Sequence, residues 1–189
     1  MRKVLEGVAR ATTTAIDGEF QRHTSPKIRT LLGSASGARW GPRGAYQVLY
    51  LGRPPTSIVV EAHRHLVDVD LDGRLTADMV GPRNLITCRV RLDRVLDLRD
   101  PANLDLVGLT LADLQTPVGE YEACQRVGRA AHQLELGGII APASTGMGET
   151  LAVFERHVQP TDFFEIIEVV TWDVLPDDPR VRTDPRYRT

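Results

Sequence analysis

Apolar and polar positions alternate with two different periods along the chain. Residues 45–52, AYQVLYLG, are rich in β-branched and aromatic side chains and predict a strand that ends at Gly52. Residues 54–57, PPTS, are a helix-start signal, and the apolar residues after them recur at helical spacing, which predicts a helix from about Ser57. The apolar stripe of that helix consists of Ile58, Val59, Ala62 and Leu66.

The rest of the chain predicts more strands than helices. Residues 85–98 alternate between apolar and polar side chains and predict a second strand. Residues 120–138 have apolar side chains at helical spacing, with Gly137 as the expected stop. Strands separated by few helices favour an α+β fold with a mixed, largely antiparallel sheet. Three further apolar runs predict strands: 138–144, 149–156 and 163–172.

The length of the chain and the positions of its prolines and glycines predict one domain. A chain of 189 residues builds one full hydrophobic core but not two. We expect a single domain over residues 1–175. The segment 176–189 contains three prolines and scarcely any apolar side chains, which is typical of a polar tail. Residues 33–44 combine glycines and a proline around Arg39 and Trp40, which predicts a loop of the kind that often carries function.

The composition limits the kinds of partner that the protein is expected to bind. Hydrophobic residues make up 42% of the chain, charged residues 25%, and the formal net charge is -2, so there is no positive field to attract nucleic acid. No apolar run of about 18 residues and no secretory signal occur, so we expect no membrane contact and a cytoplasmic location. Cys88 and Cys124 stand in apolar surroundings and are expected to be small buried hydrophobes.

Two arginines are candidate anion ligands. Arg22 stands in FQRHTSP, and Arg39 stands in the glycine-rich loop. A guanidinium group in such a setting suits bidentate binding of phosphate or carboxylate. The alternative is that both are ordinary exposed arginines, because arginine is mostly found on the surface.

Tyr50 and Glu61 are a second candidate pair. Tyr50 ends the strand that leads into the helix bearing Glu61, so a ring and a carboxylate are expected to face one pocket at this corner. A carboxylate flanked by apolar residues is partly desolvated, which marks a candidate site. The alternative is an ordinary Glu on a helix surface beside Arg64.

The sequence gives little support to a metal site, to a common nucleotide-binding loop or to a nucleophile elbow. In the run Glu61-Ala-His63-Arg-His65, only the first and last residues share a helix face, and a catalytic zinc needs three protein ligands, so no metal is expected. The glycine-rich STGMGET is not a Walker loop, and neither a GxGxxG nor a GxSxG pattern occurs.

Four landmarks occur in order between Arg22 and Glu61: R-H-T, then G-A-R-W-G, then L-Y-L-G, then V-V-E. Together with ACQRVGRAAHQLELGGIIAPAS further on, they resemble the RES-domain family, named for its Arg, Glu and Ser residues. The resemblance covers most of residues 20–158, which we take as the core of the domain.

The resemblance implies a fold similar to that of ADP-ribosyltransferases and an enzyme that degrades NAD. Members are toxins whose partner is an Xre-type helix-turn-helix antitoxin, and the same is expected here. Arg22 and Arg39 would hold the dinucleotide phosphates, Tyr50 would pack against the nicotinamide, and Glu61 would face the nicotinamide ribose. Ser144 would supply the family's Ser. Whether the chain forms a homodimer stays open.

The sequence also departs from the family pattern. The family's Gly-Gly-Arg-Trp-Asn loop has Ala38 and Gly41 here, and its Pro-Ser step falls on Ala143, one residue before Ser144. Two alternatives therefore stay open beside NAD cleavage by water or phosphate. One is an ADP-ribosyltransferase that modifies a macromolecule, and the other is a degenerate RES-like module that binds a partner without catalysis.

Overall fold

The computed structural model describes residues 2–70, 72, 74–117 and 119–180. Helices and strands are interspersed along this part of the chain. The helices are α1 (Arg2–Arg10), α2 (Pro55–Leu66), α3 (Pro101–Val107), α4 (Leu111–Leu114) and α5 (Glu122–Gln133). The strands are β1 (Thr13–Thr24), β2 (Val48–Arg53), β3 (Arg83–Asp97), β4 (Gly138–Pro142), β5 (Glu149–Phe154) and β6 (Phe163–Trp172).

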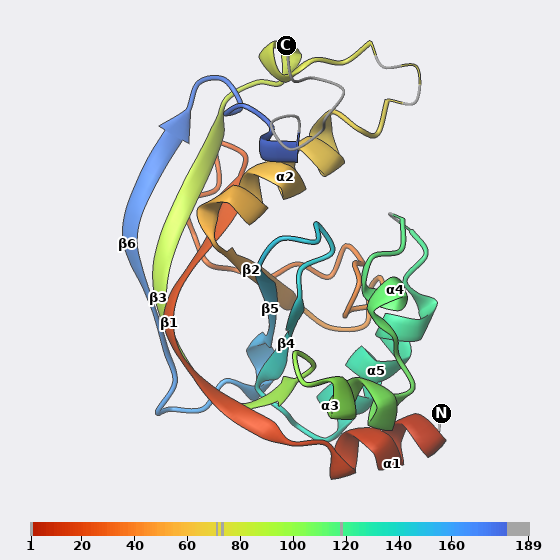
Figure 1. Ribbon diagram of the computed structural model, residues 1–189. Helices are drawn as coiled ribbons and strands as arrows, with labels where there is room; N and C mark the ends of the chain where they lie inside the picture. The colour runs from red at the N-terminus through yellow and green to blue at the C-terminus, as the bar shows by residue number, and fades with distance from the viewer. Residues whose placement is uncertain (1, 71, 73, 118, 181–189) are drawn as a thin grey trace.

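The strands form one strongly curved sheet (Figure 1). Its neighbours follow the order β1-β2-β5-β4-β3-β6, and an additional β1–β3 pairing closes the first five strands into a ring. Among the described strands, β3 and β4 are the one pair that runs in parallel. The prediction of an α+β fold with a mixed, largely antiparallel sheet is therefore confirmed.

The long strand β3 explains how the ring closes. One of its edges pairs with β1 over almost the whole length of both strands, from Thr13↔Leu96 to Thr24↔Asn84. Its other edge pairs first with β6 and then, beyond Arg91, with β4. By contrast, β1 meets β2 only at Gln21↔Gly52. The ring is thus firmly paired on one side and weakly joined on the other.

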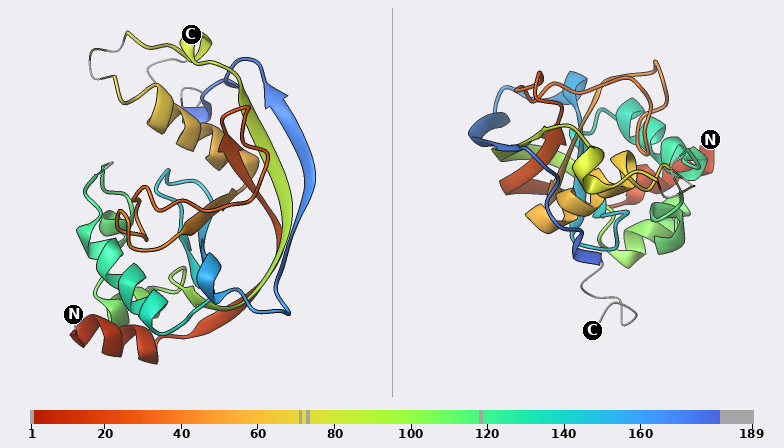
Figure 2. Two further views of the ribbon diagram at one scale, coloured as in Figure 1. Left: turned by 180° about the vertical axis from the view of Figure 1, so that it is seen from behind. Right: turned by 90° about the horizontal axis from the view of Figure 1, so that it is seen from above.

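The helices lie at the two ends of the sheet (Figures 1 and 2). Helix α2 covers one end, whereas α1, α3, α4 and α5 gather at the other end. One buried cluster around Trp40 and Phe154 joins these helices to the sheet, and a second cluster around Phe20 and Leu51 fills the inside of the curve. Cys88 and Cys124 are both buried and free, as expected from their surroundings.

Some observed elements were not predicted, and two predicted helices have other bounds. Strand β1 was not predicted, and neither were the short helices α1, α3 and α4. Helix α5 ends at Gln133 rather than at Gly137, because Glu135 adopts a left-handed backbone conformation (φ 55°) between them. The helix expected from about Ser57 begins two residues earlier, at Pro55.

The end of the described chain packs on α2. The carbonyl oxygen of Pro176 lies 3.0 Å from His63 Nε2, and Arg180 forms an ion pair with Asp68. The last nine residues of the predicted polar tail, 181–189, lie outside the described residues.

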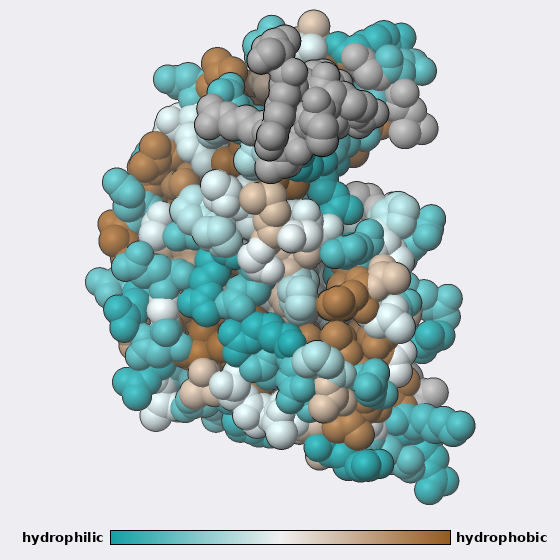
Figure 3. All heavy atoms as spheres, in the orientation of Figure 1, coloured by the Kyte–Doolittle hydropathy of each residue, from teal (hydrophilic) through white to brown (hydrophobic). Residues whose placement is uncertain are grey.

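The outer surface of β6 carries exposed apolar side chains, seen as brown spheres at the left edge of Figure 3. They include Phe163, Ile166, Ile167 and Val170. Within the part of the chain that the structure describes, no helix has the length and apolar character needed to cross a membrane.

Candidate active site

Helix α5 fixes the position of the Arg39–Trp40 loop. The loop carbonyl of Trp40 lies so close to Gly128 that an added Cβ would stand 2.0 Å from its oxygen. Gln125 Nε2 also donates to the Ala38 carbonyl oxygen at 3.0 Å. The indole of Trp40 is buried, so the loop is attached to the core on both sides.

Gly41, where the family pattern has Asn, is packed tightly in this chain. A Cβ at this position would lie 2.7 Å from Val48 Cγ2. Because Gly41 has no side chain, the loop can pack closely against β2 at this position.

The Arg39 guanidinium is held by the segment after α4. Its Nη1 donates to the Asp113 carbonyl oxygen at 3.0 Å and to Thr116 Oγ1 at 2.9 Å, and its Nη2 donates to the Thr116 carbonyl oxygen at 3.0 Å. The guanidinium carbon also lies 4.7 Å from the centre of the Tyr121 ring, in a cation–π arrangement. Arg39 therefore orders a wall of the site before any ligand arrives.

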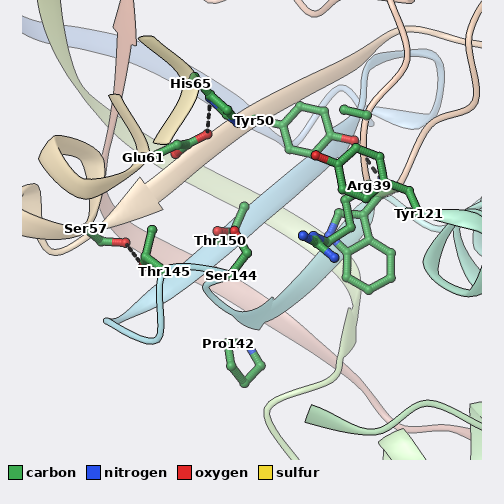
Figure 4. A pocket seen from close by; sticks show the side chains of 12 residues that line it. Arg39, Tyr50, Ser57, Glu61, His65, Tyr121, Pro142, Ser144, Thr145 and Thr150 are labelled. Atoms are coloured by element: carbon green, nitrogen blue, oxygen red, sulfur yellow. Dashed lines mark hydrogen bonds and ion pairs between the residues drawn. The ribbon is translucent and has the colours of Figure 1, made fainter. Parts of the chain in front are cut away.

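Tyr50 and Glu61 face one pocket, as predicted from their places on β2 and α2 (Figure 4). The pocket has a volume of about 160 Å³. Figure 4 shows Glu61 on one side, Arg39 and Tyr121 on the other, and Tyr50 between them. In Figure 3 the surface is hollowed between the end that carries α2 and the end that carries α4. The remaining lining residues are Ala38, Trp40, Ser57, His65, Pro142, Ser144, Thr145 and Thr150.

Burial perturbs both central groups. The Tyr50 hydroxyl accepts a hydrogen bond from the Trp40 backbone N–H at 2.9 Å, and burial raises the pKa of Tyr50, so the phenol keeps its proton. Burial also raises the pKa of Glu61 above its ordinary value of 4.5, while the charges of His65, Arg64 and Arg22 act in the opposite direction. The site thus pairs a neutral phenol with a carboxyl group that has basic side chains around it.

Ser144, the candidate for the family's Ser, lines the larger pocket and is held in place by α2. Arg64 Nη1 donates to Ser144 Oγ at 2.9 Å and also to the Ser144 carbonyl oxygen. In the next residue, Thr145 Oγ1 lies 3.1 Å from Ser57 Oγ. Loop and helix therefore form a continuous hydrogen-bonded wall.

Arg22 lies in a second, smaller pocket of about 110 Å³. The lining residues are Gln21, Arg22, His23, Tyr50 and Glu61. The two pockets share Tyr50 and Glu61, but Arg22 does not line the larger one and Arg39 does not line the smaller one. The two arginines thus line different pockets that share Tyr50 and Glu61, instead of forming one cradle.

The structure changes one premise of the sequence-based argument about metals. That argument found no third ligand beside Glu61 and His65, but His23 of β1 supplies one, and the three ligand atoms lie within 4.8 Å of one another. Arg83 Nη2 lies 3.2 Å from His23 Nδ1 and can only donate, so the neutral ring carries its proton on Nε2. Neither nitrogen of His23 then offers a free lone pair to a cation, and we assign no metal.

Several lining residues escaped the sequence analysis. Tyr121 and Thr150 come from segments without a recognisable motif, and His23 entered only as part of a landmark around Arg22. Gln125 stood in the ACQRVG landmark, but its contact with the loop carbonyl of Ala38 depends on how α5 packs. Only long-range packing brings these side chains to the site.

The geometry defines an α+β protein with a half-buried carboxylate, a phenol and two arginines around adjoining pockets. The model of the RES domain matches residues 15–176, so the chain belongs to the RES domain family.

Proteins of known identity agree with this assignment. The chain is 28% identical over 124 residues to the proteins named NAD(+) phosphorylase MbcT of Mycobacterium bovis and Mycobacterium tuberculosis. The match covers 66% of this chain, and the chain spans 64% of the length of these curated relatives. The crystal structure of the M. tuberculosis MbcT-MbcA toxin-antitoxin complex has a similar fold, with a TM-score of 0.77, 24% identity, and coverage of 91% of this chain and 93% of that one.

Proposed function

We propose that this chain binds NAD in the larger pocket and cleaves the bond between nicotinamide and ribose. The observation that carries the proposal is the position of Glu61, a half-buried carboxylate on the wall that both pockets share. The RES domain match and the name of the MbcT relatives support the choice of NAD as substrate.

The chemistry of the bond requires such a carboxylate. As the bond lengthens, positive charge develops on the ribose, and nicotinamide leaves as a neutral molecule with the bonding electron pair. A fixed carboxylate stabilises this charge, as in sugar hydrolysis. We assign this role to Glu61.

The other residues of the pocket bind and orient. Tyr50 presents a ring and a protonated hydroxyl beside Glu61, which suits packing against the nicotinamide. Ser144 and Arg39 line the opposite part of the pocket, and we propose that they contact the rest of the dinucleotide. Because most Arg39 donors are already engaged, it acts chiefly by holding this wall in place.

We also propose a biological role for this reaction. A protein that depletes NAD is toxic to its own cell, and the related MbcT has been solved in complex with the antitoxin MbcA. We therefore propose that this chain is a toxin with a protein antitoxin of the Xre type as partner.

The test is release of free nicotinamide from NAD by the purified protein. Glu61→Gln should slow release by about 100-fold or more, because fixed groups that stabilise transition-state charge contribute effects of this order. Glu168→Gln, the same change on the exposed strand β6, is the matched control and should keep full activity.

Three outcomes would contradict parts of the proposal. No nicotinamide release by the wild-type protein refutes the activity. Wild-type rates in Glu61→Gln with an unchanged melting temperature remove Glu61 from the mechanism. With NAD labelled in its adenosine part, transfer of the label to protein or nucleic acid shows an ADP-ribosyltransferase instead.

A further inference from the structure

Tyr46 holds the part of the glycine-rich loop that contains Trp40. Its hydroxyl donates a hydrogen bond to the Trp40 carbonyl oxygen at 2.9 Å, and no other donor to this oxygen lies within the described residues. The carbonyl group packs so closely against Gly128 of α5 that an added side chain there would collide with it. Because a buried carbonyl oxygen without a donor destabilises the fold, the hydroxyl of Tyr46 keeps Trp40 in this position.

The ring of Tyr46 is itself fixed by packing. It stacks on His132 of α5, with the ring centroids 4.0 Å apart and the planes 15° apart, and it meets Phe154 of β5 edge-on at 5.5 Å. Burial raises the pKa of Tyr46 to about 12, although the charge of Arg129 acts in the opposite direction. Tyr46 is therefore a fixed donor that keeps its proton near neutral pH.

Trp40 also anchors Tyr50. The Trp40 backbone N–H donates to the Tyr50 hydroxyl at 2.9 Å. Trp40 is thus held at two groups, by Tyr46 at its carbonyl oxygen and by Tyr50 at its N–H. Both groups belong to one residue, so a movement at the carbonyl group also displaces the N–H that anchors Tyr50.

This anchor sets the orientation of the Tyr50 ring. In Figure 4 the ring lies between Glu61 and Arg39, and its hydroxyl is bonded to the loop. Strand β2 fixes one end of the side chain and Trp40 fixes the other. In the proposed function the ring packs against the nicotinamide, so its angle determines how the nicotinamide lies relative to Glu61. A misplacement of about 1 Å at such a position can slow a reaction by about 100-fold.

We propose that Tyr46 is a positioning residue of the reaction, which holds Trp40 and through Trp40 fixes the ring of Tyr50 at the reaction centre. This inference rests on the proposed function. Tyr46 lines neither of the two pockets, so it acts without touching NAD.

The first test is the rate of nicotinamide release. Tyr46→Phe keeps the ring and its stacking but removes the hydroxyl. It should lower kcat about tenfold, which is the effect of leaving one buried acceptor unpaired. The KM for NAD should stay close to that of the wild type, because Arg39 keeps its own three hydrogen bonds and Ser144 is held by a different segment.

A double variant shows through which residue Tyr46 acts. Tyr50→Phe removes the anchored hydroxyl and should also be slow. If Tyr46 acts through Tyr50, a protein with both changes is no slower than Tyr50→Phe alone, because the effects of coupled residues do not add. Ser36→Ala, which removes an exposed hydroxyl from the same loop, is the control and should leave kcat unchanged in both the wild type and Tyr50→Phe.

A second measurement needs neither NAD nor turnover. The Trp40 amide hydrogen is bonded to Tyr50, so its exchange with solvent reports how firmly Trp40 is held. Tyr46→Phe should speed this exchange about tenfold, although Tyr46 bonds to the carbonyl group and not to this N–H. Ser36→Ala should leave the exchange unchanged. The melting temperature of each variant shows whether it folds.

The outcomes separate this inference from the proposed function. Losses of kcat that multiply in the double variant overturn the route through Tyr50. Wild-type kcat in folded Tyr46→Phe overturns the role in the reaction, and wild-type exchange of the Trp40 amide overturns the hold on Trp40. If the wild-type protein releases no nicotinamide, the proposed function fails, and the exchange measurement still decides whether Tyr46 holds Trp40 against Tyr50.

Discussion

The two pockets share Tyr50 and Glu61 but differ in the state of their polar groups. In the larger pocket, Arg39 donates three hydrogen bonds to residues 113–116 and lies over the Tyr121 ring. In the smaller pocket, Arg22 donates one hydrogen bond, and the Gln21 amide oxygen has no partner within the described residues. The first wall is already assembled, whereas the second keeps its hydrogen-bonding capacity for a ligand.

This difference separates residues that build a site from residues that bind in it. Arg22 and Arg39 were equivalent candidates in the sequence, because both are arginines in motifs that suit anion binding. Their partners decide their roles. A guanidinium whose donors are bound to carbonyl oxygens contributes to stability, and one with free donors contributes to affinity.

The largest effect that tests this contrast is on stability. Arg39→Ala should lower the free energy of unfolding by about 3 kcal/mol, since it removes three hydrogen bonds from a charged group to Asp113 and Thr116. Arg22→Ala, which removes one hydrogen bond, should cost about 1 kcal/mol. Urea unfolding of the two variants measures both values, and equal losses would abolish the distinction between the two walls.

A second test uses pH and the smaller pocket. Burial lowers the pKa of His23 from 6.5 to about 3, and electrostatic interactions with Arg83, His65 and Arg22 act in the same direction. As the pH falls below 6.5, the unfolded chain binds a proton that the folded chain does not, so stability decreases down to about pH 3. The slope reaches about 1.4 kcal/mol per pH unit.

His23→Gln removes this proton-linked loss. Between pH 7 and pH 5 the variant should lose about 2 kcal/mol less free energy of unfolding than the wild type. Urea unfolding at both pH values measures the difference. The same loss in both proteins would show that His23 takes up its proton in the folded state.

The smallest expected effect concerns the reaction centre itself. His65 Nδ1 lies 4.0 Å from Glu61 Oε1, and protonated His65 lowers the pKa of a carboxyl group that burial raises. In the proposed mechanism nicotinamide release requires the ionised carboxylate of Glu61, so the rate of release should fall as the pH decreases through this raised pKa. His65→Ala should move that acidic limb upward by about 0.3 pH unit, as expected for an exposed helical pair. A limb that stays in place or moves downward would contradict this coupling.

The sequence predicted the elements that have strong local periodicity. The alternation along residues 85–98 identified β3, and the Pro-Pro-Thr-Ser signal located α2 to within two residues. Strand β1 was missed because Asp17, Gly18 and Glu19 interrupt its pattern with residues that disfavour strands. Its pairing with β3 supplies the stabilisation that local propensity lacks.

The site, too, was predictable from the sequence only where it depends on residues that are close together in the chain. The strand-to-helix corner between Tyr50 and Glu61 is local, and the sequence therefore placed both residues at one pocket correctly. The separation of Arg22 from Arg39 depends on the divergence of β1 from β2, which no local pattern encodes.

By itself, the sequence determined the helices and strands with clear periodicity, the α+β class and the family landmarks, because these depend on neighbours a few residues apart. Only the tertiary structure decided which arginine is engaged, that His23 stands beside Glu61 and His65, and which amide oxygen remains without a partner among the described residues. Those properties come from contacts between segments that are about 60 to 80 residues apart, such as the β1–β3 closure, and such contacts form only when the whole sheet is in place.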